Sequence, residues 1–154
     1  MRIDTQDAAT KLAIKLATES IIRDLVSAVK ADLGKLVLLE PDGNAFFAYA
    51  GIGWSDDTFE SARIPVSDRS LAGYVVATRG AVIFENLPQS KRFRDAELLL
   101  KHGVVSSIGV AVRLNDTAVG VLSVHTRVQR TFTSEQITRV EHAGEALGEL
   151  LAKA

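Results

Sequence analysis

The sequence predicts an α+β fold, a single domain over residues 1–154 in which a long helix at each end flanks an antiparallel sheet. The first indication is the order of elements, which reads helix, hairpin, small elements, hairpin, helix. Strands that follow one another as hairpins pair antiparallel, which argues against a parallel doubly wound sheet. The second indication is length, because 154 residues fit one domain with a sizeable core.

The N-terminal helix is expected over about residues 5–33, with Gly34 as its C-cap. Polar residues recur every four positions on this segment, and apolar residues fill the remaining, wider arc. An arc wider than one seam can contact two partners, the domain's own sheet and a second helix. The residues of this helix that are candidates for a dimer contact are Leu12, Leu16, Ile22 and Val26.

The C-terminal helix is expected over about residues 134–152, beginning at a capping box formed by Thr133 and Gln136. Gly144 and Gly148 lie inside it, and each interior glycine costs roughly 1 kcal/mol relative to alanine. Close packing should offset that cost. Packing against the domain's own sheet and a helix–helix contact in a dimer both remain open. The dimer candidates on this helix are Val140, Gly144 and Gly148.

Two hairpins supply the main strands. Strand 105–114 places Ser107, Gly109 and Ala111 on one face, which leaves room for a close helix or a ligand. A helix over 71–79 is expected to be capped by Ser67 or Asp68. The remaining expected segments are strands 35–40, 45–50, 63–66, 81–85 and 118–126 and a short helix over 97–102.

Composition excludes several classes of protein. The formal net charge is -1, so nothing global attracts nucleic acid. There are no cysteines, which excludes disulfides, thiolate metal sites and thiol nucleophiles. No secretory signal and no apolar run near the ~20 residues of a membrane span is present, so a cytoplasmic protein without membrane contact is expected.

Several motifs, taken in order, resemble the GAF domain family over nearly the whole chain. The resemblance implies a six-stranded antiparallel sheet, with the terminal helices on one face and short helices and loops over a ligand pocket on the other. It also implies a sensory or dimerising module in signal transduction, fused to or partnered with a kinase, cyclase, phosphodiesterase or transcription regulator. The segments that carry the resemblance are Ile64–Val66, Ser70–Gly80, Asn86 with Ser90–Phe93, Ser106–Val112, Val119–Val124 and Phe132–Glu135.

The resemblance also bears on cofactors. Of the pattern found in cyclic-nucleotide binders of the family, only Phe132 and one acidic residue at 135 match, which argues against a cyclic nucleotide. A covalently attached bilin and the sulfoxide-reductase activity of some members both require a cysteine that this chain lacks. Haem remains a weaker alternative, with His102 as the axial ligand, and no other metal site is expected.

The pocket candidates combine aromatic walls with a few polar groups, a composition suited to a small ligand. No nucleophile elbow or catalytic triad context is present, so no enzyme and no catalytic residue is expected. The two hypotheses that remain are a ligand-binding sensor that acts through a homodimer of terminal helices, and a purely structural dimerisation module. The pocket candidates are Trp54, Phe59, Tyr74, Arg79, Phe93, His102, Ser107 and Ser123.

Overall fold

The computed structural model describes residues 5–67, 69–89 and 97–153. Its centre is a six-stranded sheet in the order β3-β2-β1-β6-β5-β4, antiparallel at every pairing, which confirms the α+β prediction. The elements are α1 (Thr5–Ala28), β1 (Leu33–Leu39), β2 (Ala45–Ile52), α2 (Asp56–Glu60), β3 (Arg63–Pro65), α3 (Leu71–Ala77), β4 (Val82–Phe84), the 3-10 turn η1 (Leu87–Gln89), α4 (Glu97–Lys101), β5 (Ser106–Leu114), β6 (Thr117–Thr126) and α5 (Ser134–Leu151).

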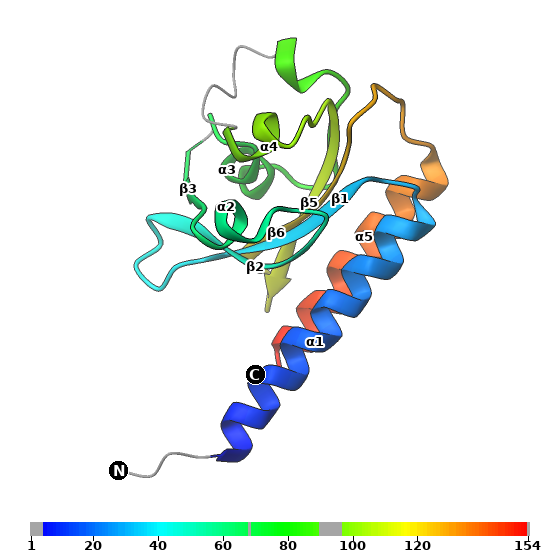
Figure 1. Cartoon of the computed structure of the whole chain (residues 1–154). Coiled ribbons are helices and arrows are strands. Elements are labelled where there is room, and N and C mark those ends of the chain that lie inside the picture. Colours follow the sequence, from blue (N-terminus) through cyan, green and yellow to red (C-terminus); the bar gives the residue numbers. More distant parts are fainter. Residues whose placement is uncertain (1–4, 68, 90–96, 154) are drawn as a thin grey trace.

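Helices cover both faces of the sheet. The long helices α1 and α5 run antiparallel, side by side, along one face, and the short helices α2, α3 and α4 lie over the other (Figure 1). We call the face beneath α2–α4 the inner face. The alternation of β5 decides which residues face which layer. Ile108, Val110 and Val112 join the core shared with α1 and α5, whereas Gly109 lies beneath Val75 of α3.

The end of α1 differs from the expected boundary. The helix ends at Ala28 rather than near residue 33, and Lys30 adopts a left-handed φ of 57°. The Ala31 N–H bonds to the Val26 carbonyl and the Lys30 N–H to the Ser27 carbonyl, the two bonds of a Schellman motif. Gly34 is therefore a strand residue and not a C-cap. It lets α1 approach β1, because a Cβ there would lie 2.6 Å from Val26 Cγ2.

The two glycines of α5 pack against the sheet of the same chain. A Cβ on Gly144 would lie 2.9 Å from Val110 Cγ2, and one on Gly148 would lie 2.6 Å from the Arg113 carbonyl oxygen. Ile22 and Val140 are fully buried in the core between the long helices and the sheet. Intramolecular packing thus accounts for the glycine spacing, and the capping box of Thr133 and Gln136 is present as expected.

The N-terminus of α3 is set by a tight turn. Ser70 is the N-cap, not Ser67 or Asp68, and its hydroxyl oxygen accepts the Gly73 N–H at 3.0 Å. Gly73 is required here, because a Cβ would lie 2.0 Å from the Ser67 carbonyl oxygen. This contact holds the start of α3 down over the inner face.

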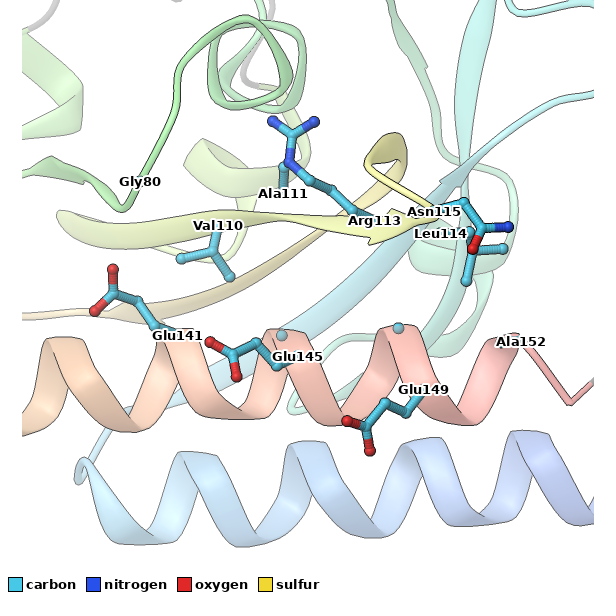
Figure 2. Close-up of a pocket in the computed structure, with 12 residues that line it drawn as sticks. Gly80, Val110, Ala111, Arg113, Leu114, Asn115, Glu141, Glu145, Glu149 and Ala152 are labelled. Carbon is cyan, nitrogen blue, oxygen red and sulfur yellow. The ribbon is translucent and has the colours of Figure 1, made fainter.

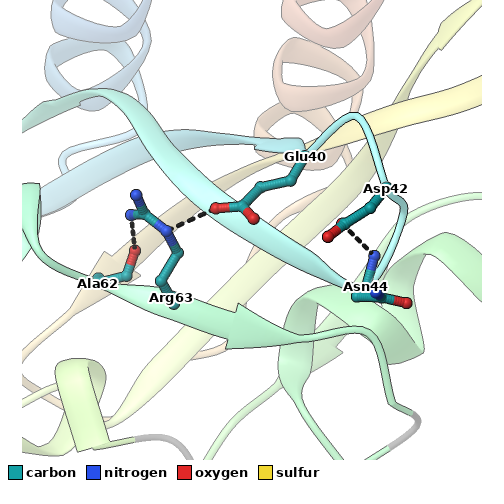
Figure 3. A network of polar contacts seen from close by, with 5 residues as sticks. All are labelled: Glu40, Asp42, Asn44, Ala62 and Arg63. Atoms are coloured by element: carbon teal, nitrogen blue, oxygen red, sulfur yellow. Dashed lines mark hydrogen bonds and ion pairs between the residues drawn. The ribbon is translucent and has the colours of Figure 1, made fainter.

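The β1–β2 hairpin and the edge strand β3 are joined by polar contacts (Figure 3). Arg63 of β3 forms an ion pair with Glu40 and donates to the Ala62 carbonyl, while Asp42 accepts the Asn44 N–H within the turn. The Glu40–Arg63 ion pair thus links the end of β1 to the edge strand β3. Among the described helices, none combines the length and apolarity needed to cross a membrane.

Candidate functional site

Four polar side chains lie together on the inner face, where apolar residues surround them. Lys35 of β1 lies opposite Ser123 of β6, and His125 of β6 lies opposite Ser107 of β5. Each of the four is at most 2% exposed. We call these residues the inner-face polar cluster. Burying polar groups costs free energy unless they find partners, so this placement needs an explanation that packing alone does not supply.

His125 lies at the centre of the cluster. Its Nδ1 is 2.6 Å from Ser107 Oγ and its Nε2 is 2.9 Å from Ser123 Oγ, so both ring nitrogens are hydrogen-bonded. Burial, and then the charge of Lys35, hold the pKa of His125 well below its ordinary value. The imidazole is therefore neutral at physiological pH, and one serine donates to it while the other accepts.

Lys35 differs from the other three because it has no partner for its charge. Among the described residues the Lys35 ammonium has no ion pair and no hydrogen bond, and its nitrogen keeps a little accessible surface, because no fully enclosed side-chain nitrogen or oxygen there lacks a hydrogen-bond partner. Burial lowers the pKa of Lys35 to about 8. At neutral pH the side chain is still mostly protonated, so the inner face holds a buried positive charge.

The Lys35 side chain borders a small cavity between the sheet and the roof. The cavity has a volume of about 30 Å³, room for roughly two water molecules. Ser70 is its other polar wall, but the Ser70 hydroxyl is already bonded to the Pro65 and Ser67 carbonyls and to Gly73. The remaining walls are apolar and come from β3, α3 and α4: Ile64, Leu71, Ala72, Leu98 and Leu99.

Trp54 connects the polar cluster to the roof. Its indole N–H donates to the Gly34 carbonyl at 2.8 Å, and its ring meets those of His125 and His102 edge-on, with centroids 5.4 and 5.0 Å apart. His102 Nε2 accepts the Ser55 N–H at 3.0 Å, so Nδ1–H donates to the Leu98 carbonyl. Both nitrogens of His102 are thus in use, and ligation of haem iron would break one of these bonds.

The structure brings together four of the sequence-predicted site residues, Trp54, His102, Ser107 and Ser123. Phe59 stacks on the Trp54 ring, with centroids 5.7 Å apart. Tyr74 packs edge-on against Phe84, near β4, and Arg79 is exposed beyond the end of α3. Phe93 lies outside the described residues. Within the described residues, no three histidine or acidic side chains are placed to hold a metal ion.

Sequence reasoning missed two members of the cluster. The sequence predicts Lys35 only as the first residue of a strand, and His125 is not among the pocket candidates. The signal was available in part, because Lys35 precedes a run of four apolar residues, Leu36–Leu39, as an isolated charge. Burial of that charge depends on roof helices that are distant in sequence, so the strand pattern alone does not reveal it.

A larger hollow lies on the opposite side of the sheet, along α5. It is a groove of about 500 Å³ between α5 and the end of β5, lined by Glu141, Glu145 and Glu149 from successive turns of the helix (Figure 2). The groove exists because β4 pairs only with residues 107–109 and leaves the rest of β5 uncovered. It is open to solvent and holds no buried polar side chain, so the inner face is the stronger candidate for a ligand site.

The family model for the GAF domain matches residues 15–151. The antiparallel sheet, with long terminal helices on one face and short helices over the other, is a GAF-like fold. The chain therefore belongs to the GAF domain family, whose members serve as sensory and regulatory domains in signalling proteins. A search of curated protein sequences finds no match to it.

Solved structures agree on the fold. The GAF domain of a phosphoenolpyruvate-protein phosphotransferase from Acinetobacter has a TM-score of 0.78 at 17% identity, with 99% of this chain and 96% of that chain covered. A domain of a putative two-component sensor histidine kinase from Sinorhizobium meliloti 1021 has 0.71 at 13%, with 89% of each chain covered. The type II free methionine-R-sulfoxide reductase from Thermoplasma acidophilum has 0.77 at 16%, with 94% of this chain and 96% of that chain covered. At these identities the likeness shows the fold alone.

Proposed function

We propose that this GAF domain is a sensor that binds a small molecule between the inner face and the roof formed by α2, α3 and α4. The observation that carries the proposal is the inner-face polar cluster. A module that only dimerises gains nothing from a lysine and a histidine buried beneath short helices, where apolar residues of similar size would pack with less cost. Ligand sites characteristically place a few polar groups in an apolar chamber.

The contacts of the roof provide a route from this chamber to the long helices. Leu99 of α4 lines the cavity, and the carbonyl of nearby His102 accepts a hydrogen bond from Arg127 Nε at 2.9 Å. The Arg127 backbone N–H donates to the Asp32 carboxylate at 2.7 Å, just beyond the end of α1. A ligand that displaces α4 would therefore act on the connection between α1 and the sheet, provided that it binds one arrangement better than the other.

The first prediction uses a variant that fills the small cavity beside Lys35. Ala72→Leu adds apolar atoms to the cavity wall, so we expect binding to weaken at least about tenfold, a loss of about 1.4 kcal/mol. Native mass spectrometry of protein purified without refolding should detect a bound small molecule on the wild type and not on this variant.

The matched control is Ala77→Leu, an exposed position on the same helix, which should bind as the wild type does. Thermal unfolding of both variants must first establish that they fold. A wild-type protein that carries no small molecule, and whose melting temperature no fraction of a cell extract raises, would contradict the proposal.

The second candidate function is dimerisation through α1, favoured by two exposed leucines. Leu12 and Leu16 are 59% and 57% exposed, one turn apart on the N-terminal half of the helix. Figure 1 shows this half of α1 extending past the end of α5, beyond the sheet. A second copy packed on these leucines would cover them. Since Ile22, Val26, Val140, Gly144 and Gly148 pack within the chain, we propose that the dimer contact is formed around Leu12 and Leu16.

The corresponding experiment replaces both leucines with glutamate. We expect the wild type to be a dimer by light scattering and the Leu12→Glu, Leu16→Glu variant to be a monomer, because burying carboxylates in an apolar contact is strongly unfavourable. Thr10→Glu, exposed on roughly the opposite side of the same helix, is the control and should remain a dimer. A wild type that is monomeric at high micromolar concentration would eliminate this candidate.

We propose that the domain is not an enzyme. Two structurally similar proteins are free methionine-R-sulfoxide reductases, one of them from Thermoplasma acidophilum. This chain has no cysteine to act as the nucleophile that such chemistry is expected to use. The output is proposed to pass to a kinase, cyclase, phosphodiesterase or transcription-regulator module, fused or separate, in the cytoplasm.

A further inference from the structure

We propose that the cavity beside Lys35 is an anion site that takes the carboxylate of a small monocarboxylic acid with an uncharged, apolar tail. This inference rests on the proposed sensor function and names the class of its ligand. Three features of the site support it, namely the charge of Lys35, the lack of other free polar groups among the described residues of the site, and the apolar walls of the cavity.

The charge is the first feature. Lys35 is 2% exposed, borders the cavity, and meets no carboxylate among the described residues. A buried ammonium without a counterion is costly, and an anionic ligand would offset that cost. A cationic ligand is excluded by the same charge. A neutral ligand would leave the ammonium uncompensated.

The hydrogen-bonding groups that are free in the described part of the site limit the ligand to a single charged group. The hydroxyls of Ser107 and Ser123 are bonded to His125, and the Ser70 hydroxyl is bonded to backbone groups. Among the described residues of the site, Lys35 alone is left to receive a ligand, and it supplies one positive charge and three donors. A phosphate dianion would retain an unpaired charge against apolar walls, whereas a carboxylate matches the single charge of Lys35.

The walls decide the nature of the tail. Five of the seven cavity residues are apolar, and two of these, Leu98 and Leu99, belong to the short roof helix α4. The cavity of about 30 Å³ holds little more than two water molecules, so a longer acid must move these leucines. Tail length would therefore determine how far α4 is displaced, and through His102 and Arg127 how strongly the end of α1 is affected.

The experiment compares acids with their neutral amides on the full chain. Acetate, propionate and butyrate are titrated at constant ionic strength by calorimetry, with acetamide, propionamide and butyramide as neutral controls of the same shape and inorganic phosphate as a second anion. We expect the wild type to bind the carboxylates at least about tenfold more tightly than the amides, as a charge-assisted hydrogen bond should provide.

Two variants locate the binding. Lys35→Met keeps side-chain length without charge and should weaken carboxylate binding about 10- to 100-fold, while Lys101→Met removes an exposed charge from α4 and should not change it. With lysine labelled by ¹³C, bound carboxylate should raise the pKa of Lys35 above its value in the free protein, a readout that a purely structural role would not move.

The outcomes separate this inference from the sensor function. The inference would be overturned by any of three results: amides bind as tightly as acids, phosphate binds as tightly as carboxylates, or Lys35→Met has an unchanged affinity for carboxylates. None of these results would contradict the proposed sensor function. If neither acids nor amides bind, while a cell-extract fraction still raises the melting temperature, the ligand class is wrong and the sensor remains. If no probe of any kind binds, both fail.

Discussion

Lys35→Met is expected to stabilise the ligand-free protein by roughly 3 kcal/mol at neutral pH. The pKa of Lys35 falls from 10.5 to about 8 because the side chain is buried, so the folded state disfavours the charged form that predominates at neutral pH. Methionine has a similar length and no charge, and replacing a buried charge by a packed apolar group commonly stabilises a protein. Chemical denaturation at pH 7 would measure the difference.

The pH dependence of the gain follows from the same pKa values. Below pH 8 both states hold the proton and the full cost of burying the charge applies. From about 8 to 10.5 the unfolded chain binds a proton that the folded chain lacks, so wild-type stability rises with pH, and above 10.5 the cost is gone. The advantage of Lys35→Met should therefore be constant below pH 8 and disappear toward 10.5.

Lys101→Met serves as the control, since its side chain is exposed and its replacement should change stability by less than about 0.5 kcal/mol. A Lys35→Met protein that is less stable than the wild type at pH 7 would mean that the ammonium has a stabilising partner. The lysine would then be a structural residue, and its availability to a ligand would be refuted.

The burial of Lys35 also connects stability with the proposed function. The buried charge of Lys35 destabilises the ligand-free protein, and an anionic ligand that pairs with it would stabilise the bound protein. A ligand that binds only the folded state adds its binding free energy to stability. The same residue would then lower the stability of the empty domain and supply affinity to the occupied one. Functional sites in other proteins commonly carry such a cost.

Local patterns were sufficient to predict most of the sheet. The alternation along residues 105–114 identified both faces of β5, and the left-handed φ values of Asn115 and Asp116 are those of a tight turn that joins β5 to β6. The end of α1 could not be placed in the same way. Leu33 continues the apolar spacing of the helix, but the Schellman turn at Lys30 and the pairing of Leu33 with His125 draw it into the sheet.

From the sequence, the candidate site could be predicted only at residues whose type is common in ligand sites. Trp54, a loop aromatic, and His102, an isolated histidine, are predicted pocket residues, and their rings are in contact. The group that gives the chamber its charge is a lysine on a strand, a residue ordinarily exposed. Its burial follows from the position of α3 and α4 over β1, which is a property of the assembled fold and not of the strand.

His125→Gln is expected to remove an acid-induced loss of stability that the wild type shows below about pH 6.5. Burial first, and the charge of Lys35 second, hold the pKa of His125 well below 6.5 in the folded state, while the unfolded chain titrates near that value. As pH falls below 6.5 the unfolded state binds a proton that the folded state does not. Wild-type stability should then decrease by up to about 1.4 kcal/mol per pH unit from this residue alone.

The groups that face His125 determine how the experiment must be controlled. Ser107 and Ser123 bond to its two nitrogens, the Trp54 ring packs against it nearly at right angles, and Lys35 adds a positive charge nearby. Acidic side chains titrate in the same range, so the quantity to compare is the difference in slope between the wild type and His125→Gln, with the exposed His142→Gln as control. Equal slopes in all three proteins would contradict the assignment.

The predictions for Lys35→Met and His125→Gln are linked, because the charge of Lys35 affects both of them. Since Lys35 contributes to the lowered pKa of His125, Lys35→Met should let His125 take up its proton at a higher pH in the folded state, although burial still holds its pKa down. The acid-induced loss of stability should therefore end at a higher pH in Lys35→Met than in the wild type. A bound carboxylate would neutralise the same charge and should shift His125 in the same direction, which makes the histidine an internal reporter of an occupied chamber.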